Sequence, residues 1–484
     1  MNSKKTSTFA SMVLAGTALL GACSLAGGSS KSEFRKPDFR TVEFNENTSC
    51  KISFWHTMGQ TSMEYLDTAI EIFHETYPNI EIEHGNQGGY PEILSKISKA
   101  VSANTTPTMA YCYPDHVATY GVGKQVLQLS GYEGSLMDIT KDEDTFVPAF
   151  LEEGKKYGYK DDNGKDILFS VPFQKSTEVL FYNKTIFDKK GWSAPLYWEN
   201  PSDPDDIKSF VGLAKAIKAD ADLKDKIPLG YDSDDNMFIT MCHQYNIPYT
   251  KAVLKENGKV DKENSFLFNN SQAKEMVTKL KGWYDNGYIV TKGTLENNSY
   301  TSTKFAKDCT ILMSIGSTGG TGYNYSTAFK AGVAQIPQQA VIDNSCSYGQ
   351  ILQGPSICFF PQKTHTDVQL RAAWEFYKFL SSDTYSAYFA NMTGYEPVRT
   401  ASYEVDTYDP TLPAAGDAAK GEFYKSVADL VKTEAVLNNY FTNDVFKGSA
   451  VARTQVGGII TDVFSGASTI DQAFRKAYDN CINS

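Results

Sequence analysis

The chain has 484 residues, of which 41% are hydrophobic and 21% charged, so it can form the cores of two or three domains and is not disordered as a whole. Lysine and arginine number 46 against 57 aspartates and glutamates, which gives a net charge of -11. Proteins that bind nucleic acid need a basic face, so no nucleic-acid partner is expected. Aromatic residues make up 13% of the chain, with 29 tyrosines, and rings of this kind suit a surface that stacks on partly polar ligands.

The first 23 residues indicate export and membrane anchoring. Lys4 and Lys5 precede an uncharged apolar stretch, residues 9–20, which is shorter than the roughly 20 residues that a membrane span needs. The stretch ends in Leu-Gly-Ala before Cys23, and this pattern resembles the lipobox of bacterial lipoproteins. The resemblance implies a signal peptide over residues 1–22, acylation of Cys23 with palmitate-type chains, and a place on the extracytoplasmic face of the cell membrane. A plain secretory signal is the alternative.

Residues 23–47 are rich in serine and glycine and then in mixed charges, without periodicity, and predict a flexible tether. Seven further cysteines follow, none in a CxxC pair and none with a histidine at metal-ligand spacing. Their odd number argues against a complete disulfide framework and leaves one or two bridges open. We expect neither a metal site nor a cofactor.

The first elements after the tether alternate between strands and helices. Residues 51–55 alternate as a strand, and residues 62–77 carry apolar side chains at helical spacing up to Pro78, which ends the helix. Residues 80–84 alternate again, and Pro91 opens a second helix. Strand, helix, strand, helix is typical of a mainly parallel sheet flanked by helices.

The remaining pattern is mostly helical, with no solenoid repeat and no long linker between two halves. Asp162-Asn163-Gly164 indicates a hairpin. Helices are predicted over residues 207–217, 273–284, 370–380, 421–437 and 468–480.

We therefore predict an α/β fold of two lobes, a clamp with a ligand cleft between the lobes and several chain crossovers. One lobe is expected to comprise residues 48–155 plus about 315–375. The other is expected to comprise about 156–314 plus 376–484.

Motifs for several chemistries are absent or incomplete. The sequence contains no P-loop and no GxSxG, and Gly319-Gly-Thr-Gly322 lacks the flanking strand and helix of a dinucleotide site. Residues 232–243 begin like an EF-hand loop, but Met237 and His243 replace its glycine and glutamate, so an acidic solvated loop is favoured over calcium. The histidines form no zinc motif. A pair of carboxyl groups facing across a cleft, as a glycosidase needs, is left open by the sequence.

Motifs shared in the same order over some 400 residues, from about residue 50 to the end, resemble the solute-binding lipoproteins of bacterial ABC importers. The likeness is to the carbohydrate and glycerol-phosphate branch, and it rests on residues 54–59, 88–94, 106–115, 171–187, 335–338, 372–380 and 393–398. The resemblance implies a monomeric binding protein, not an enzyme, whose lobes close on a sugar or polyol phosphate and deliver it to the permease.

Carried over motif by motif, the resemblance implies ligand contacts from Tyr90, Asp115, Ser176, Trp198, Ser317, Gly354, Tyr395 and Phe446. Tyr90 and Tyr395 offer rings and hydroxyls, and Trp198 matches the family's tryptophan beneath the ligand. Asp115 follows a strand end, where α/β proteins bind ligands and where a carboxylate accepts hydroxyl hydrogen bonds.

The other implied contacts are small groups. Ser176 supplies a hydroxyl, Ser317 lies in a loop able to present backbone N–H groups, and Gly354 would let ligand approach the backbone closely. The structural alternatives are a packed loop tyrosine for Tyr90, a helix cap for Asp115 and a simple turn for Ser317.

One departure from the family bears on the ligand. Glycerol-phosphate-binding members have a late arginine that grips phosphate, and here Phe446 takes its place, with Lys447 beside it. A guanidinium offers phosphate a bidentate fork, whereas lysine gives a point charge and phenylalanine an apolar face for sugar C–H groups. With the acidic net charge, this favours a neutral carbohydrate over a phosphate ester. Lys175 would then meet a phosphate or face solvent.

Two further functional classes stay open at this point. One is an extracellular glycan-active hydrolase, and the other is a non-transport solute receptor on the same fold.

Overall fold

The computed structural model describes residues 35–406, 408–409 and 416–484, so Cys23 and the predicted lipobox lie outside the described residues. Within the described part, none of the helices combines the length and the apolar character that a bilayer crossing requires. The seven cysteines that the structure describes are all free thiols.

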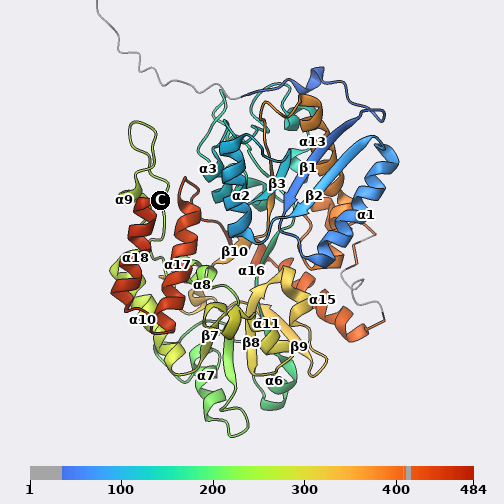
Figure 1. Cartoon of the computed structure of the whole chain (residues 1–484). Coiled ribbons are helices and arrows are strands. Elements are labelled where there is room, and N and C mark those ends of the chain that lie inside the picture. The colour runs from blue at the N-terminus through green and yellow to red at the C-terminus, as the bar shows by residue number, and fades with distance from the viewer. Residues whose placement is uncertain (1–34, 407, 410–415) are drawn as a thin grey trace, which may run out of the picture. The chain divides into compact units, whose positions relative to one another are not determined.

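Two sheets organise the chain from residue 34 onward (Figure 1). The first has the order β2-β1-β3-β11-β4, with β1 parallel to β2 and β3 and with β11 antiparallel to β3 and β4. The second has the order β12-β10-β5-β8-β6-β7, with β9 also paired to β5. The strands are β1 (Cys50–His56), β2 (Ile80–Asn86), β3 (Met109–Cys112), β4 (Val171–Pro172), β5 (Ser176–Asn183), β6 (Ile227–Tyr231), β7 (Ile289–Thr291), β8 (Ile311–Ser317), β9 (Ala331–Gln335), β10 (Gln350–Gln353), β11 (Ser356–Phe359) and β12 (Tyr440–Phe441).

Helices flank both sheets, which confirms the predicted α/β fold. The helices are α1 (Gln60–Thr76), α2 (Tyr90–Ala103), α3 (Pro114–Tyr120), α4 (Leu136–Thr140), α5 (Pro148–Glu153), α6 (Lys184–Lys190), α7 (Phe210–Ala219), α8 (Asp234–Gln244), α9 (Lys262–Ser265), α10 (Ser271–Asp285), α11 (Thr301–Ala306), α12 (Thr321–Asn324), α13 (Asp367–Leu380), α14 (Asp383–Thr393), α15 (Ala418–Val431), α16 (Glu434–Leu437), α17 (Ser449–Phe464) and α18 (Ile470–Asn483). The predicted helix over residues 421–437 is two helices, α15 and α16, and α17 was not predicted.

Four of the predicted helices begin at a polar side chain that caps them. The side chains of Ser209, Asn270, Thr366 and Thr469 each accept a hydrogen bond from a backbone amide in the first turn of α7, α10, α13 and α18. In α13 and α18 a glutamine at the third position returns the bond, which satisfies a second free donor. These caps explain why the periodicity of the sequence predicted these helices well.

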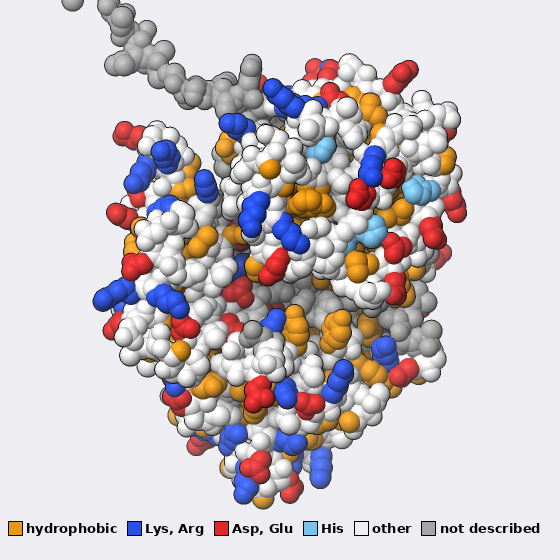
Figure 2. Space-filling view, in the orientation of Figure 1, with side chains coloured by type: hydrophobic (Ala, Val, Ile, Leu, Met, Phe, Trp, Pro, Cys, Tyr) orange, Lys and Arg blue, Asp and Glu red, His pale blue; other side chains and the backbone are white. Residues whose placement is uncertain are grey.

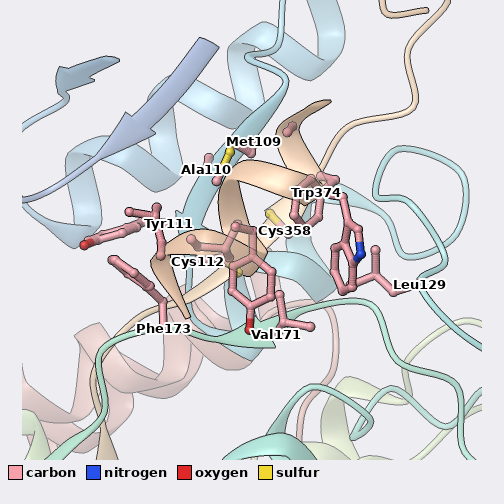
Figure 3. Packing of buried hydrophobic residues seen from close by; sticks show 14 of the residues in the cluster. Met109, Ala110, Tyr111, Cys112, Leu129, Val171, Phe173, Cys358 and Trp374 are labelled. Atoms are coloured by element: carbon pink, nitrogen blue, oxygen red, sulfur yellow. The ribbon is translucent and has the colours of Figure 1, made fainter. Parts of the chain in front are cut away.

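The first lobe is the five-stranded sheet with the buried cluster that packs on it. Figure 3 shows part of that cluster, where Trp374 of α13 lies beside Leu129 and Tyr111 of β3 lies beside Phe173. The Tyr111 and Phe173 ring centroids are 5.8 Å apart. Burial of such large rings supplies most of the driving force that holds α13 on the sheet.

The part of the predicted tether that the structure describes belongs to the first lobe. Phe39 is 1% exposed, and its amide donates to the Gly134 carbonyl at 2.9 Å. Arg35 donates to the carbonyl of Pro361 at 2.9 Å and pairs with Asp367. The tether prediction was therefore wrong for residues 35–47, because one buried ring and one paired guanidinium fix this stretch to the folded body.

The second lobe is the seven-stranded sheet with its own buried clusters, including residues from α7, α8, α10, α17 and α18. The division between the lobes differs from the expected one. The strands β8, β9 and β10, which follow residue 310, belong to the second sheet, whereas β4 and most of α14 pack in the first lobe. The reason is that β5 is a central strand that pairs with β8, β9 and β10.

The chain passes between the lobes at residues 173–175, at residues 354–355 and again after α14. The first two passages touch at Gly354, which has φ +86° and whose added Cβ would lie 1.9 Å from the Gln174 carbonyl oxygen. The Lys175 ammonium, fully buried, pairs with Glu153 and donates to the Gly354 carbonyl at 3.0 Å. No side chain fits at residue 354 while the passages stay in contact.

We expect Gly354→Ala to lower the free energy of unfolding by more than about 3 kcal/mol, because it adds both backbone strain and a clash with a carbonyl. Gly191→Ala is the matched control, since Gly191 has φ +70° but nothing within 4 Å of an added Cβ. Strain alone costs about 1–2 kcal/mol there. Urea unfolding of both variants measures the difference, and equal losses would contradict the close contact.

Candidate functional site

A cavity between the two sheets is lined by side chains from both lobes. Figure 2 shows the surface hollowed between the part that carries α2 and α3 and the part that carries β7 and β8. The cavity measures about 40 Å³, room for two or three water molecules. Its lining residues are Tyr113, Pro114, Asp115 and Glu153 from the first lobe and Tyr249, Thr250, Ile351, Leu352, Thr442, Asn443, Asp444, Val445, Ser449 and Arg453 from the second.

The first lobe contributes the end of β3 and the start of α3. Tyr113 caps α3, and its ring lies 4.5 Å from that of Tyr90 at the start of α2. Asp115 sits in the first turn of α3, where its carboxylate accepts from the His116 amide at 2.9 Å. The wall of the first lobe therefore presents the Tyr113 ring, which Tyr90 backs, beside the carboxylates of Asp115 and Glu153.

The second lobe contributes Arg453 from α17, which packs against α3. Its Nη1 donates to Asn236 Oδ1 at 2.6 Å and lies 3.5 Å from Asp235 Oδ2, both at the start of α8. Its Nε lies 3.8 Å from Asp115 Oδ2 of the first lobe. One guanidinium therefore joins both walls of the cavity.

Asn236 extends this contact to the middle of the second sheet. Glu178 of β5 is 1% exposed, and its carboxyl group is hydrogen-bonded to the side chains of Tyr231, Asn236 and Gln353. Burial raises the pKa of Glu178 to about 8, although these hydrogen bonds lower it. A polar chain thus runs from Glu178 through Asn236 and Arg453 to Asp115.

The cavity also contains a polar group with no partner. The Thr250 hydroxyl, on the cavity wall, is buried and makes no hydrogen bond within residues 35–406, 408–409 and 416–484. A buried hydroxyl without a partner costs about 1–3 kcal/mol. A bound solute or water that reached Thr250 would recover that energy.

Four of the eight implied ligand residues lie in two places at the cleft. Asp115 lines the cavity, and Tyr90 packs behind Tyr113. Tyr395 lies against the turn that Ser317 caps, because a Cβ on Gly319 would be 2.7 Å from the Tyr395 ring. The phenol of Tyr395 is close enough to interact electrostatically with those of Tyr90 and Tyr113, so the two places adjoin.

The other implied residues have structural positions. Trp198 is fully buried, donates to Gln244 Oε1 at 2.9 Å and stacks on Trp283, while Phe446 packs on Phe266 with 5% of its surface exposed. Neither lines the cavity, because both rings complete the apolar core of the second lobe. This corrects the expected ligand contacts of both.

Three residues of the crossing passages serve the fold. Gly354 makes room for the Gln174 carbonyl rather than for a ligand, and Ser176 is buried at the start of β5 opposite Gln353. Lys175 neither meets solvent nor lies free for a phosphate, since it pairs with Glu153. A group does approach Gly354 closely, as the sequence predicted, but it is the Gln174 backbone carbonyl and not a ligand.

The sequence reasoning missed Arg453, Asn236 and Glu178. Arg453 lies on α17, whose apolar residues surround most of the helix and include Gly457 and Gly458, so no amphipathic stripe marked it. Glu178 gave a usable signal, because it is a lone carboxylate directly before the apolar run Val-Leu-Phe in the same strand, β5. A charged residue that shares a strand with such a run predicts a buried polar partner.

Comparison with known proteins identifies the family. The family model described as bacterial extracellular solute-binding protein matches residues 68–416. The chain belongs to this family. The resemblance to solute-binding proteins of ABC importers is thereby confirmed, while the lipid anchor stays a prediction.

Relatives and solved structures agree with that family. The chain is 25% identical over 446 residues to the sn-glycerol-3-phosphate-binding periplasmic protein UgpB of Salmonella typhimurium, covering 88% of this chain and 91% of that one. The GacH receptor of Streptomyces glaucescens superposes with a TM-score of 0.65 at 17% identity, over 90% of this chain and 97% of that chain. UgpB from Mycobacterium tuberculosis in complex with glycerophosphocholine gives 0.65 at 16%, over 90% and 98%. These likenesses confirm the two-lobed fold.

Glu396, beside the crossing passages, provides a test of the buried network. Its amide donates to the Lys175 carbonyl at 2.6 Å, and its carboxylate accepts from the Tyr440 hydroxyl at 2.9 Å. Burial raises the pKa of Glu396 to about 7 from an ordinary value of 4.5, although the Tyr440 hydroxyl lowers it. Between pH 4.5 and pH 7, Glu396 is therefore protonated in the folded state and ionised in the unfolded chain.

This difference makes the folded protein lose stability as pH rises from about 4.5 to 7, with the loss retained above pH 7. We expect Glu396→Gln to exceed the unmodified protein in unfolding free energy by up to about 3 kcal/mol at pH 8, and by little near pH 5. Urea unfolding at both pH values measures this. Glu256→Gln, on an exposed loop, is the control, and a Glu396→Gln variant that is less stable at pH 8 would contradict the assignment.

Proposed function

We propose that this protein captures a neutral, hydroxyl-rich solute, a carbohydrate, between its lobes and delivers it to the transmembrane permease of an ABC importer. The cavity of about 40 Å³ is smaller than a sugar ring, so the proposal requires the lobes to move apart before the solute enters. The observation that carries the proposal is the pairing of Arg453. Of the described residues that line the cavity, Arg453 is the basic one, and Asp115, Asp235 and Asn236 already engage it.

The balance of charge supports a neutral solute. Asp115 and Asp444 line the cavity and Asp235 lies beside it, whereas the charge of Glu153 is matched by Lys175. A phosphate would meet more carboxylates than cations and would have to displace Asp115 from Arg453. Sugar hydroxyls instead donate to carboxylates and accept from the guanidinium, and sugar rings stack on Tyr113 and Tyr249.

A glycerol-phosphate ester is the second candidate, and Arg453 favours it. A guanidinium on a helix beside two aromatic rings can grip a phosphate bidentately. The relatives named for sn-glycerol-3-phosphate, and the UgpB structure with glycerophosphocholine, make such esters necessary members of any test panel.

The pairing of the carboxylates in the cavity supports a binding protein rather than a glycosidase. A glycosidase needs one protonated acid and a second free carboxylate. Here Lys175 engages Glu153, Arg453 lies beside Asp115, and Asp444 accepts from the Ala252 amide at 2.9 Å. The proposal includes solute-driven closure of the lobes and anchoring through Cys23 on the extracytoplasmic face of the membrane.

Titration calorimetry tests the solute class with maltotriose and other neutral oligosaccharides, sn-glycerol-3-phosphate and glycerophosphocholine. We expect a neutral oligosaccharide to bind more tightly than about 1 mM, roughly -4 kcal/mol, and the phosphate esters to bind at least about tenfold more weakly. A reversed order would select the second candidate. Absence of binding across the panel would overturn carbohydrate capture.

The cavity residues are tested with the solute that binds in that panel. Asp115→Asn should weaken binding about tenfold or more, since it removes charge-assisted hydrogen bonds to the solute and to Arg453. Lys447→Gln removes an exposed charge on the same segment as the cavity wall and should change the affinity less than about twofold. Equal effects of the two substitutions would place the solute elsewhere.

A further inference from the structure

Two histidines meet at the carboxyl ends of β1 and β2, outside the cavity. His56 is fully buried, and its Nε2 lies 3.0 Å from Nδ1 of His84, with the ring centroids 5.3 Å apart. His84 Nε2 lies 2.8 Å from Asp67 Oδ1 on α1. All these contacts belong to the first lobe.

The positions of the ring protons follow from a single backbone contact. The Met58 amide donates to His56 Nδ1 at 3.2 Å, so this nitrogen carries no proton. The proton of neutral His56 is therefore on Nε2 and is donated to His84 Nδ1. The proton of His84 is then on Nε2 and is donated to Asp67. Each of the four ring nitrogens has a hydrogen-bond partner. The two N–H groups of the pair both donate in the direction from His56 to Asp67.

The segment at residues 57 and 58, which is hydrogen-bonded to His56, also contacts Tyr90. The side chain of Thr57, between His56 and Met58, is hydrogen-bonded to the Tyr90 hydroxyl. The Gln87 amide donates to the His56 carbonyl at 2.8 Å, and the Asn86 side chain donates to the Met58 carbonyl. The loop at 57–59 and the loop at 86–89 thus form one unit that places Tyr90 against Tyr113.

A third proton cannot be added without loss of a contact. A third proton on His84 Nδ1 would point at the Nε2–H of His56. If the His56 proton moved to Nδ1 to avoid this, it would point at the N–H of Met58. Burial lowers the pKa of His56 to about 4, with a further contribution from His84, although Asp67 raises it. Either position of the added proton therefore costs one of the two contacts, His56–His84 or Met58–His56.

The surroundings of the pair contain few other charges. The rings that face His56 are Phe54 and Tyr111, at 5.3 and 6.0 Å, and Asp67 is the charged group that α1 presents.

We propose that His56 and His84 are positioning residues for Tyr90, and that a third proton on this pair in mild acid releases the Thr57–Met58 loop and weakens solute capture. The weakening of capture rests on the proposed function. The release of the loop does not, because it is argued from hydrogen bonds within the first lobe.

Hydrogen exchange of the solute-free protein tests the release at pH 7.5 and 5.5, with rates corrected for the intrinsic effect of pH. We expect the protection of the amides in residues 56–60 to fall at least about tenfold between these pH values. His84→Asn keeps an acceptor near Nδ1 but cannot take up the proton, so its protection should change less than about twofold. His74→Gln, on α1, removes a histidine whose Nε2 lies 2.8 Å from the Ile80 carbonyl, and should keep the full decrease.

Protection of residues 56–60 that does not change with pH in the unmodified protein would overturn the proposal, and so would an equal decrease in His84→Asn. If His84→Asn melts at a lower temperature than the unmodified protein at pH 7.5, the test uses the hydrogen exchange of the unmodified protein alone. In that case the decrease must be confined to residues 56–60 and 86–90 and must be absent at the buried Ile97 of α2. The exchange experiment uses solute-free protein, so its result can be interpreted even if the proposed function is wrong.

Discussion

The contact between the two passages at Gly354 and Gln174 is the constraint on which the site depends. With no side chain at residue 354, β10 can pair with β5 in the second sheet while β11 pairs with β4 in the first. The buried Lys175 adds a charged link to Glu153, which lines the cavity. A buried ion pair is weak evidence for added stability, but loss of one partner leaves an uncompensated charge. The cavity walls are therefore set by the crossing itself.

The polar chain from Glu178 to Asp115 connects that crossing with the cavity. Each member has a stated partner: Glu178 holds Asn236, Asn236 holds Arg453, and Arg453 faces Asp115 across the cavity. A solute hydroxyl that enters between Arg453 and Asp115 replaces one lobe-to-lobe contact by two, with partners of both signs. A phosphate would compete with Asp115 instead. We therefore expect charge, more than size, to separate the two candidate solute classes.

The sequence predicted the fold better than the site. Apolar periodicity marked α1, α10, α13 and α18, and alternation marked β1 and β2, because these elements have one exposed face. It failed for α17, which is buried on most sides. Motif matching pointed to Asp115, which lines the cavity, and to Tyr90 behind Tyr113, since these follow the ends of β3 and β2. It placed Trp198 and Phe446 on the ligand because a motif gives a position along the chain, whereas the side of the element that faces the cavity is decided by packing.

The central claim is that the solute lies between the two sheets and touches both. A crystal structure of the protein with the solute that binds most tightly in calorimetry tests it directly. We expect electron density bounded by Tyr113 and Asp115 on one side and by Arg453 and Tyr249 on the other. Density for the solute on the outer face of one lobe, with Arg453 and Asp115 still in contact, would contradict it.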